Sequence, residues 1–111
     1  MIRRKQKDQE IWLSEFDRHI QEHLSNEFFT IVELASLMNC SKRQLQRKFK
    51  DYTGNSPNQY LKELRLKKAY EYLEEGAFPT VKETALAVGF RDAVYFSRQF
   101  KQRFDMLPSE V

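Results

Sequence analysis

The chain has 111 residues, a formal net charge of +3, 32% charged residues and 41% hydrophobic residues, which predicts a single globular domain rather than a disordered chain. No apolar run approaches the roughly 20 residues of a membrane span, and residues 1–10 lack the apolar core of a secretory signal. The single cysteine, Cys40, excludes an internal disulfide and fits a reducing cytoplasm. We therefore expect a soluble, intracellular domain without a membrane span.

Helix-start signals divide the chain. A hydroxyl residue followed three positions later by Glu or Gln is the pattern of a capping box. This pattern occurs at Thr30–Glu33, Ser41–Gln44, Ser56–Gln59 and Thr80–Glu83, and Asp92 is placed to cap one further helix. Because no window shows strand alternation with hairpin turns, the chain is predicted to be all-α. The expected helices cover residues 8–24, 31–38, 42–52, 57–75, 81–88 and 93–104, and a short last helix opens at 107–109.

The expected helix at 57–75 has an unusual distribution of apolar residues. They lie around most of its circumference instead of along one stripe: Tyr60, Leu61, Leu64, Leu66, Ala69, Tyr70, Tyr72 and Leu73. A helix packed on one side needs only a single stripe. We therefore expect this helix to be a connector shared by two small lobes.

Charge is distributed unevenly along the chain. Residues 8–33 contain seven acidic residues and only one basic residue, Arg18, whereas residues 41–50 contain five basic residues and no acid. Such asymmetry indicates a polyanionic partner that meets a local surface. A basic stretch can equally be a solvated face, and charge alone leaves both interpretations open.

A repeat explains where the basic residues lie. The sequence "QRKFK" at 46–50 returns as "SRQFK" at 97–101, and the match extends upstream, where residues 30, 33 and 35 correspond to residues 80, 83 and 85. Each copy consists of a short capped helix, a tight turn and a basic helix, which is a helix-turn-helix. The chain is thus predicted to contain two such lobes.

The basic helix of each copy has two faces. At about 100° per residue, Leu45 and Phe49 face inward in the first copy, and the opposite arc carries Lys42, Arg43, Gln46, Arg47 and Lys50. In the second copy the inward residues are Phe96, Phe100 and Phe104, and the outward residues are Val94, Ser97, Arg98 and Lys101. The aromatic residues share helical spacing with the apolar stripe, so we assign them to the core. Two exposed basic helices of this kind suit DNA major grooves.

Residues 29–109 resemble the tandem helix-turn-helix DNA-binding domain of AraC/XylS-type bacterial transcription regulators. The resemblance depends on "SKRQLQRKFKDYTGNSPNQYLKELRLKKA" at 41–69 and "ETALAVGFRDAVYFSRQFKQRFDMLPSE" at 83–110. It implies homeodomain-like three-helix lobes at 8–54 and 76–111, a shared linker helix at 55–75, and two recognition helices in successive major grooves.

The resemblance also implies residue roles. Base contacts are expected from Arg43, Gln46 and Arg47 in the first lobe and from Val94, Ser97 and Arg98 in the second. Phosphate contacts are expected from Lys42, Lys48, Lys50 and Lys101. Three positions depart from the family pattern: Asp105 stands where glycine is usual, Asn39 replaces a smaller turn residue, and Val111 lies near a missing aromatic-basic ending.

These features predict sequence-specific binding of double-stranded promoter DNA by a bacterial transcription regulator in the cytoplasm, associated with the nucleoid. RNA polymerase is a candidate further partner. The chain is expected to be the output domain of a longer sensor or response regulator with a separate sensing or dimerisation domain, residues 3–7 then ending a linker. A complete small regulator is the alternative context.

Other classes of function fit less well. His19 and His23 have the spacing of a helical zinc pair, but no third ligand lies near them in the sequence, and we expect no metal and no cofactor. The three glycines are dispersed and cannot form a phosphate-cradling loop, so an enzyme is not expected. The serious alternative is a helical protein-interaction module that docks on an acidic partner. It is disfavoured because the apolar anchors are used inside the lobes, which leaves no evident hydrophobic patch.

Overall fold

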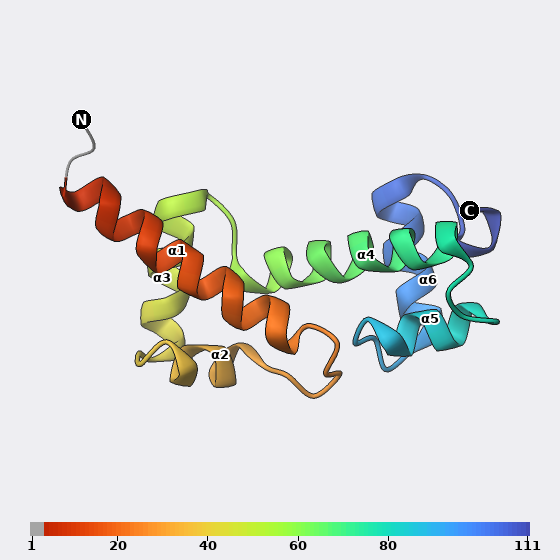
Figure 1. Ribbon diagram of the computed structural model, residues 1–111, viewed down its shortest axis with the longest axis horizontal. Helices are drawn as coiled ribbons and strands as arrows, with labels where there is room; N and C mark the ends of the chain where they lie inside the picture. Colours follow the sequence, from red (N-terminus) through yellow and green to blue (C-terminus); the bar gives the residue numbers. More distant parts are fainter. Residues whose placement is uncertain (1–3) are drawn as a thin grey trace. The chain divides into compact units, whose positions relative to one another are not determined.

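The structure is a computed structural model that describes residues 4–111. Six α-helices and one 3-10 helix occupy this range, and it contains no strand, which confirms the all-α fold class (Figure 1). None of the described helices is long and apolar enough to cross a membrane. The elements are α1 (Arg4–His23), α2 (Ile31–Leu37), α3 (Lys42–Thr53), α4 (Pro57–Glu75), α5 (Val81–Ala87), α6 (Ala93–Phe104) and η1 (Pro108–Glu110).

The side-chain caps start the helices where the sequence predicts. Ser41 and Gln44 form a complete capping box, with bonds of 3.1 Å and 2.9 Å, and Ser56 and Gln59 form another with two bonds of 3.1 Å. Only half of the expected box forms at α2 and α5, where the hydroxyls of Thr30 and Thr80 accept from the backbone N–H three residues later. The predicted cap at Asp92 is confirmed, since its carboxylate accepts from the backbone N–H groups of residues 94 and 95.

Some helix ends differ from the predicted ones. The first helix begins at Arg4 instead of residue 8, so the expectation that residues 3–7 end a linker is wrong for residues 4–7, and residue 3 lies outside the described residues. α3 extends to Thr53, where the left-handed Gly54 (φ 79°) ends it with an N–H bond to the carbonyl of Lys50. The predicted last helix is a single 3-10 turn, η1.

The first of two compact units comprises residues 4–23 and 29–61. Its core contains Phe16, Ile20, Leu34, Leu45 and Phe49, each at most 2% exposed. The rings of Phe16 on α1 and Phe49 on α3 stack at a centroid distance of 4.3 Å. One face of α1 therefore packs directly against the inward face of the basic helix α3.

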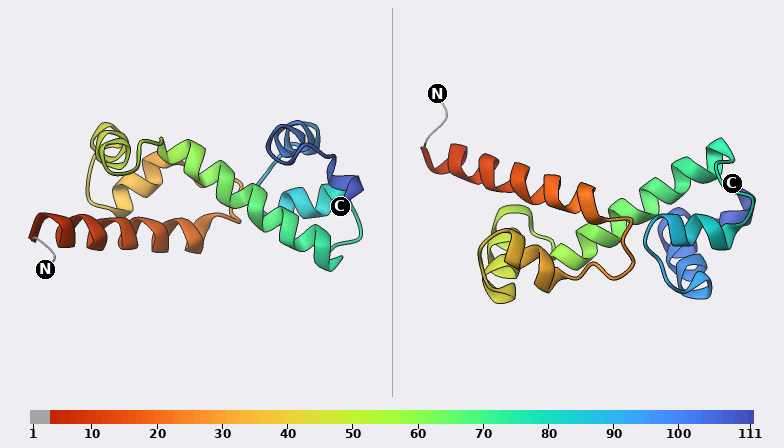
Figure 2. Two further views of the ribbon diagram at one scale, coloured as in Figure 1. Left: turned by 90° about the horizontal axis from the view of Figure 1, so that it is seen from above. Right: turned by 60° about the horizontal axis from the view of Figure 1, so that its bottom comes forward.

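The second unit comprises residues 24–28 and 62–111. Here α5 and α6 lie beside the C-terminal part of α4 (Figure 2). Its buried core consists of Leu66, Ala69, Ala85, Val88, Phe90, Phe96 and Phe100. Residues 24–28 of the loop between α1 and α2 belong to this unit, although the residues on both sides of them belong to the first.

The helix α4 contributes to both units, which accounts for the broad distribution of its apolar residues. Its first turns, through the buried Leu61, group with the first unit, and the remainder groups with the second. Leu66 and Ala69 are buried in the second core, and Leu73 packs against that core while partly exposed. The buried apolar residues of α4 are thus divided between the two units.

Candidate nucleic-acid interface

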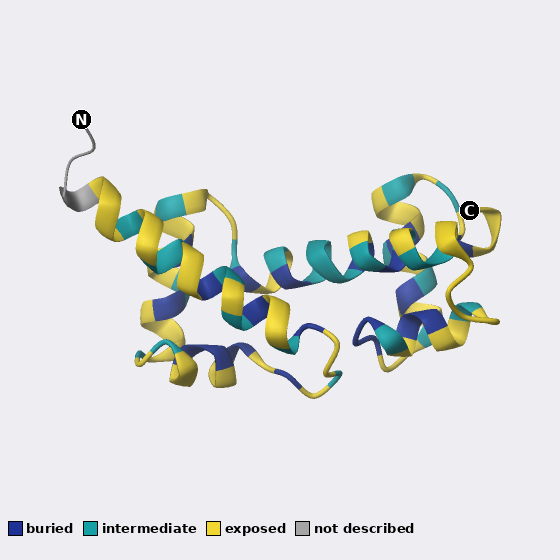
Figure 3. Ribbon diagram, viewed as in Figure 1, coloured by how far each residue is buried: buried dark blue, intermediate teal, exposed yellow. Residues whose placement is uncertain are grey.

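The basic helix of the first unit is α3. Its N-terminus is held by the Ser41 capping box, and its apolar face is buried at Leu45 and Phe49. Figure 3 shows the alternation of buried and exposed positions along this helix. Of the outward arc predicted from the sequence, Gln46 is half-buried, and the exposed members are Lys42, Arg43, Arg47 and Lys50. The arc that the sequence predicts is therefore an exposed cationic face with a glutamine at its edge.

Aromatic rings hold α3 in place. Tyr60, at the start of α4, meets Phe49 edge-on at a centroid distance of 5.4 Å and donates its hydroxyl to the Asp17 carboxylate on α1 at 2.7 Å. Burial raises the pKa of Tyr60 to about 12, and the bond to Asp17 and its negative charge act in the same direction. The phenol is therefore protonated at neutral pH and donates a hydrogen bond to Asp17, which connects α1 to the start of α4 beside α3.

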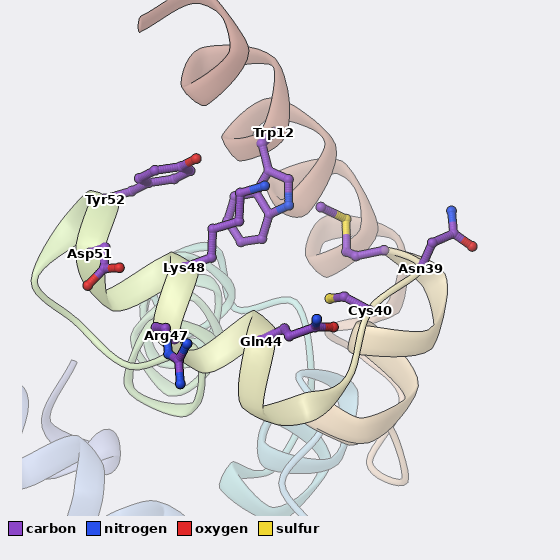
Figure 4. A pocket seen from close by; sticks show the side chains of 9 residues that line it. Trp12, Asn39, Cys40, Gln44, Arg47, Lys48, Asp51 and Tyr52 are labelled. Carbon is purple, nitrogen blue, oxygen red and sulfur yellow. The ribbon is translucent and has the colours of Figure 1, made fainter. Parts of the chain in front are cut away.

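Lys48 differs from the other lysines of α3. Its Nζ lies 5.1 Å from the ring centroid of Trp12 on α1 and 5.9 Å from that of Tyr52, which is cation–π geometry (Figure 4). At about 100° per residue, Lys48 also lies roughly 100° around the helix from Arg47, on the side toward α1. Its ammonium therefore holds α3 against α1 in this structure, whereas Arg47 points away from Trp12 (Figure 4).

Cys40 lines the same region. A pocket of 560 Å³ between α1, the turn and α3 is bordered by residues that include Trp12, Cys40, Lys48 and Tyr52. Burial raises the pKa of the Cys40 thiol, and the charge of Lys48 opposes this shift without overcoming it. Because the thiolate is the nucleophile, a raised pKa makes this cysteine a poor one at neutral pH.

The basic helix of the second unit is α6. Phe96 and Phe100 are fully buried as expected, but Phe104 is only half-buried, because it lies in the last turn at the edge of the core. Val94 is 63% exposed, and Arg98 and Lys101 are exposed, whereas Ser97 is half-buried. These residues line an open groove of 730 Å³ along α6.

Polar contacts with α4 fix α6. The Arg103 Nε donates to both carboxylate oxygens of Glu63, at 2.7 Å and 2.9 Å, and the Lys62 Nζ donates to Gln99 Oε1 at 3.0 Å. The helix ends at Asp105, which adopts the left-handed conformation (φ 57°) in place of the family's glycine. Its N–H donates to the carbonyl of Lys101 at 2.8 Å, so the substitution leaves the helix end intact.

The structure thus collects the candidate residues on two helix faces. Arg43, Gln46 and Arg47 share α3 in the first unit, and Val94, Ser97 and Arg98 share α6 in the second. Sequence reasoning missed Arg91, an exposed residue of the second turn whose guanidinium carbon lies 5.4 Å from the ring centroid of Phe28. It was overlooked because it precedes α6, although a basic residue directly before a helix cap is a readable signal.

The histidines of α1 have ordinary neighbours. The His23 ring stacks on Phe29 at a centroid distance of 4.8 Å, and His19 Nε2 lies 3.4 Å from Arg18 Nη2. Within residues 4–111, no group of three or more His, Cys, Asp or Glu side chains could hold a metal ion.

Two copies of a helix-turn-helix, each with a capped second helix that presents cationic side chains, define the class of fold. A family profile described as "Helix-turn-helix domain" matches residues 34–111. The transcriptional regulator CdhR of Pseudomonas aeruginosa is 34% identical over 98 residues, which cover 88% of this chain and 27% of CdhR.

Solved structures agree with this assignment. The C-terminal domain of the response regulator yesN from Fusobacterium nucleatum superposes with a TM-score of 0.81 at 28% identity, covering 86% of this chain and 91% of that domain. The DNA-binding domain of AdpA, solved in complex with a target DNA, superposes with a TM-score of 0.80 at 31% identity, covering 88% and 86% of the two chains. This chain belongs to the AraC-type helix-turn-helix family. It spans about a quarter of the length of CdhR.

Proposed function

We propose that this chain is a sequence-specific double-stranded DNA-binding domain of a bacterial transcription regulator. The observation that carries the proposal is the pair of helices α3 and α6, each capped at its start, buried through its aromatic residues and cationic on its exposed face. A second helix of a helix-turn-helix enters the major groove, where base edges can be read. We propose that α3 and α6 each enter a major groove, the two grooves being successive along the duplex.

We propose that some of the exposed side chains contact base edges and that others contact phosphates. Arg43, Gln46 and Arg47 on α3 have long polar side chains that can make bidentate contacts with guanine or adenine edges. On α6, Arg98 can do the same, while Ser97 offers one hydroxyl and Val94 only apolar contact with a thymine methyl. We infer that the first unit carries most of the sequence specificity.

The phosphate backbone supplies the remaining affinity. We propose that Lys42, Lys50 and Lys101 neutralise phosphates, as do Arg47 and Arg98 where they reach the backbone. About five such contacts give a slope of log affinity against log salt near −4 to −5. Lys48 enters this set only if it leaves the Trp12 ring.

The relatives support a proposal about the context of the domain. CdhR extends well beyond the matched region, and the matched part of yesN is the C-terminal domain of a response regulator. We propose that this chain is likewise the non-enzymatic output domain of a regulator whose separate domain senses a signal or dimerises. Promoter DNA would place it at the nucleoid in the cytoplasm, with RNA polymerase as a further partner.

The protein-interaction alternative has weaker support. The described residues do expose ten large apolar side chains, whereas the sequence predicted only that no evident hydrophobic patch remains. They are distributed over several elements, and Ile11, Phe28, Leu86 and Val94 lie on four different ones. Scattered apolar residues of this kind are ordinary on protein surfaces and do not form a docking groove by themselves.

Selection of bound sequences from a random duplex pool tests the proposed function. We expect an enriched motif in two parts, and gel-shift titrations on that motif should show the steep salt slope. Lys101→Ala should weaken all sequences nearly alike, because phosphate contacts carry no base information. Failure to enrich any motif, combined with binding of an acidic protein, would support the interaction module instead.

A further inference from the structure

The loop between α1 and α2 is built into the second unit by Arg65 of α4. Arg65 Nε donates to the carbonyl oxygen of Leu24 at 2.8 Å, and Nη2 donates to that of Asn26 at 3.0 Å. Burial lowers the pKa of this guanidinium, as expected for a cation that is partly withdrawn from water. Because charge-assisted hydrogen bonds hold two carbonyls of a five-residue loop, the course of residues 24–28 is well defined.

The turn of the second helix-turn-helix packs directly on this loop. Gly89 is buried and has a φ of 96°, which favours glycine. A Cβ at this position would overlap the carbonyl oxygen of Leu24 and lie 2.7 Å from Arg65 Nε. The backbone of the turn therefore meets the loop with no room for a side chain between them, and the loop has a fixed place beside the turn that precedes α6.

Phe28 at the end of the loop projects toward solvent and carries Arg91. The Asn26 side chain accepts a bond from the Phe28 N–H at 2.9 Å, and the Phe28 residue is 61% exposed. The Arg91 guanidinium carbon lies 5.4 Å from the Phe28 ring centroid. No ion pair formed within residues 4–111 includes Arg91, which directly precedes Asp92, the cap of α6.

We propose that Phe28 and Arg91 form a preorganised phosphate-binding arm beside the second recognition helix. This inference rests on the proposed function and adds two residues, one from a loop outside both helix-turn-helix motifs. A cation–π contact does not use the N–H groups of the guanidinium as donors to an oxygen, so these groups stay available for phosphate oxygens. An arginine already held by a ring also loses less side-chain freedom when it binds.

The geometry places the arm where the DNA backbone is expected. The first residues of a recognition helix enter the groove, so the residue directly before its cap stands near the groove edge and the phosphates. Arg91 acts there as a charge, whereas Phe28 acts only by positioning Arg91. Loss of Arg91 should therefore change the salt dependence of binding, whereas loss of Phe28 should not.

Fluorescence anisotropy titrations of the selected duplex over a range of salt concentrations test the arm. Arg91→Ala should reduce the steepness of the salt slope by about 0.9 and weaken binding about fivefold at physiological salt. Phe28→Ala should weaken binding about two- to fivefold with the slope unchanged, because Arg91 keeps its charge. The double variant should bind like Arg91→Ala alone, and Phe28→Tyr should bind like the wild type.

Arg18→Ala is the matched control, since it removes an exposed arginine that pairs with Glu22 on α1, and both affinity and slope should stay unchanged. Circular dichroism and urea unfolding show whether each variant is folded. An unchanged slope in Arg91→Ala, or effects of Phe28→Ala and Arg91→Ala that multiply in the double variant, overturns the arm while DNA binding stands. A wild-type chain that binds no duplex overturns the proposed function and the arm together.

Discussion

The basic helices α3 and α6 share a sequence pattern but are supported differently. Behind α3, rings stack and meet edge-on, from Phe16 through Phe49 to Tyr60. Behind α6, buried phenylalanines are supplemented by the bonds of Arg103 to Glu63 and of Lys62 to Gln99. The duplicated pattern therefore specifies the helix caps and the apolar spacing. The contacts that hold each basic helix in place differ between the two units.

The turns of the two motifs show the same divergence. Asn39 in the first turn is exposed at a φ of 58°, a conformation that Asn tolerates. Gly89 in the second turn is buried against the loop of residues 24–28 and has no space for a Cβ. The first turn is exposed at Asn39 and accepts a side chain there. The second turn is packed against residues 24–28 at Gly89 and does not.

The largest expected effect comes from the buried leucines of α4. Leu61→Ala and Leu66→Ala should each lower the free energy of unfolding by about 2–5 kcal/mol, because each leaves a cavity in a packed core. Leu61 groups with the first unit and Leu66 with the second, so hydrogen exchange should lose protection first in the corresponding unit. Equal loss of protection in both units for either variant would show that the cores behave as one.

The turns should respond unequally to added side-chain bulk. Gly89→Ala should destabilise the chain by about 2–4 kcal/mol through overlap with the loop and the cost of the left-handed conformation. Asn39→Gly should change stability by less than about 1 kcal/mol, since the site is exposed and its backbone suits glycine. Urea unfolding of both variants measures the difference, and comparable losses would mean that the turns are equivalent after all.

Base reading should be concentrated in the first unit. Arg43→Ala or Arg47→Ala should relax preference in one half-site by about 1–3 kcal/mol for each lost bidentate contact. Arg98→Ala should relax preference less across the other half-site, because Val94 and Ser97 beside it discriminate weakly. A saturation scan of the selected site with each variant tests this, and strong preference that depends on Arg98 alone would reverse the assignment.

The hydrogen bond of Tyr60 behind α3 and the ion pair of Glu63 behind α6 should contribute differently to the free energy of unfolding. Tyr60→Phe should cost about 1–2 kcal/mol, because a partly buried hydrogen bond to a carboxylate is lost. Glu63→Gln should cost less than about 1 kcal/mol, since both side chains of the Arg103 pair are partly exposed. Thermal unfolding of both variants and the wild type at neutral pH measures the two losses of stability.

The Tyr60 bond also predicts a pH dependence of stability. The pKa of Tyr60 is raised to about 12 in the folded chain from an ordinary value of 10.0. A raised pKa means that the contribution is complete below pH 10 and is lost as the pH rises through 12. The Tyr60→Phe variant should lack this part of the alkaline loss, and identical profiles for variant and wild type would contradict the role of the bond.

The smallest expected effect distinguishes two lysines of α3. Lys50→Ala should make the salt slope of DNA binding shallower by about 0.9, whereas Lys48→Ala should leave the slope unchanged. Lys48→Ala should instead reduce stability by about 0.5–1 kcal/mol, because its cation–π contact with Trp12 is lost. Trp12 is the single tryptophan of the chain, so its fluorescence reports this contact directly.

The sequence by itself determined the helices, the starts of α2 to α6 and the faces of the basic helices. Local rules suffice for these features: a hydroxyl or carboxylate cap acts on N–H groups two or three residues away, and apolar spacing assigns Leu45, Phe49, Phe96 and Phe100 to the interior. The motifs at 41–69 and 83–110 also identified the family, which the comparisons confirm.

Only the tertiary structure decided which distant groups meet. The attachment of residues 24–28 to the second unit depends on Arg65, about 40 positions away in the chain, and on the absence of a Cβ at Gly89. In the sequence nothing distinguishes Lys48 from the other lysines of α3, and only the structure shows that its ammonium lies over the Trp12 ring. Periodicity describes one helix at a time, so it cannot reveal which side of that helix another element covers, and the proposed roles of Lys48, Phe28 and Arg91 therefore came from packing.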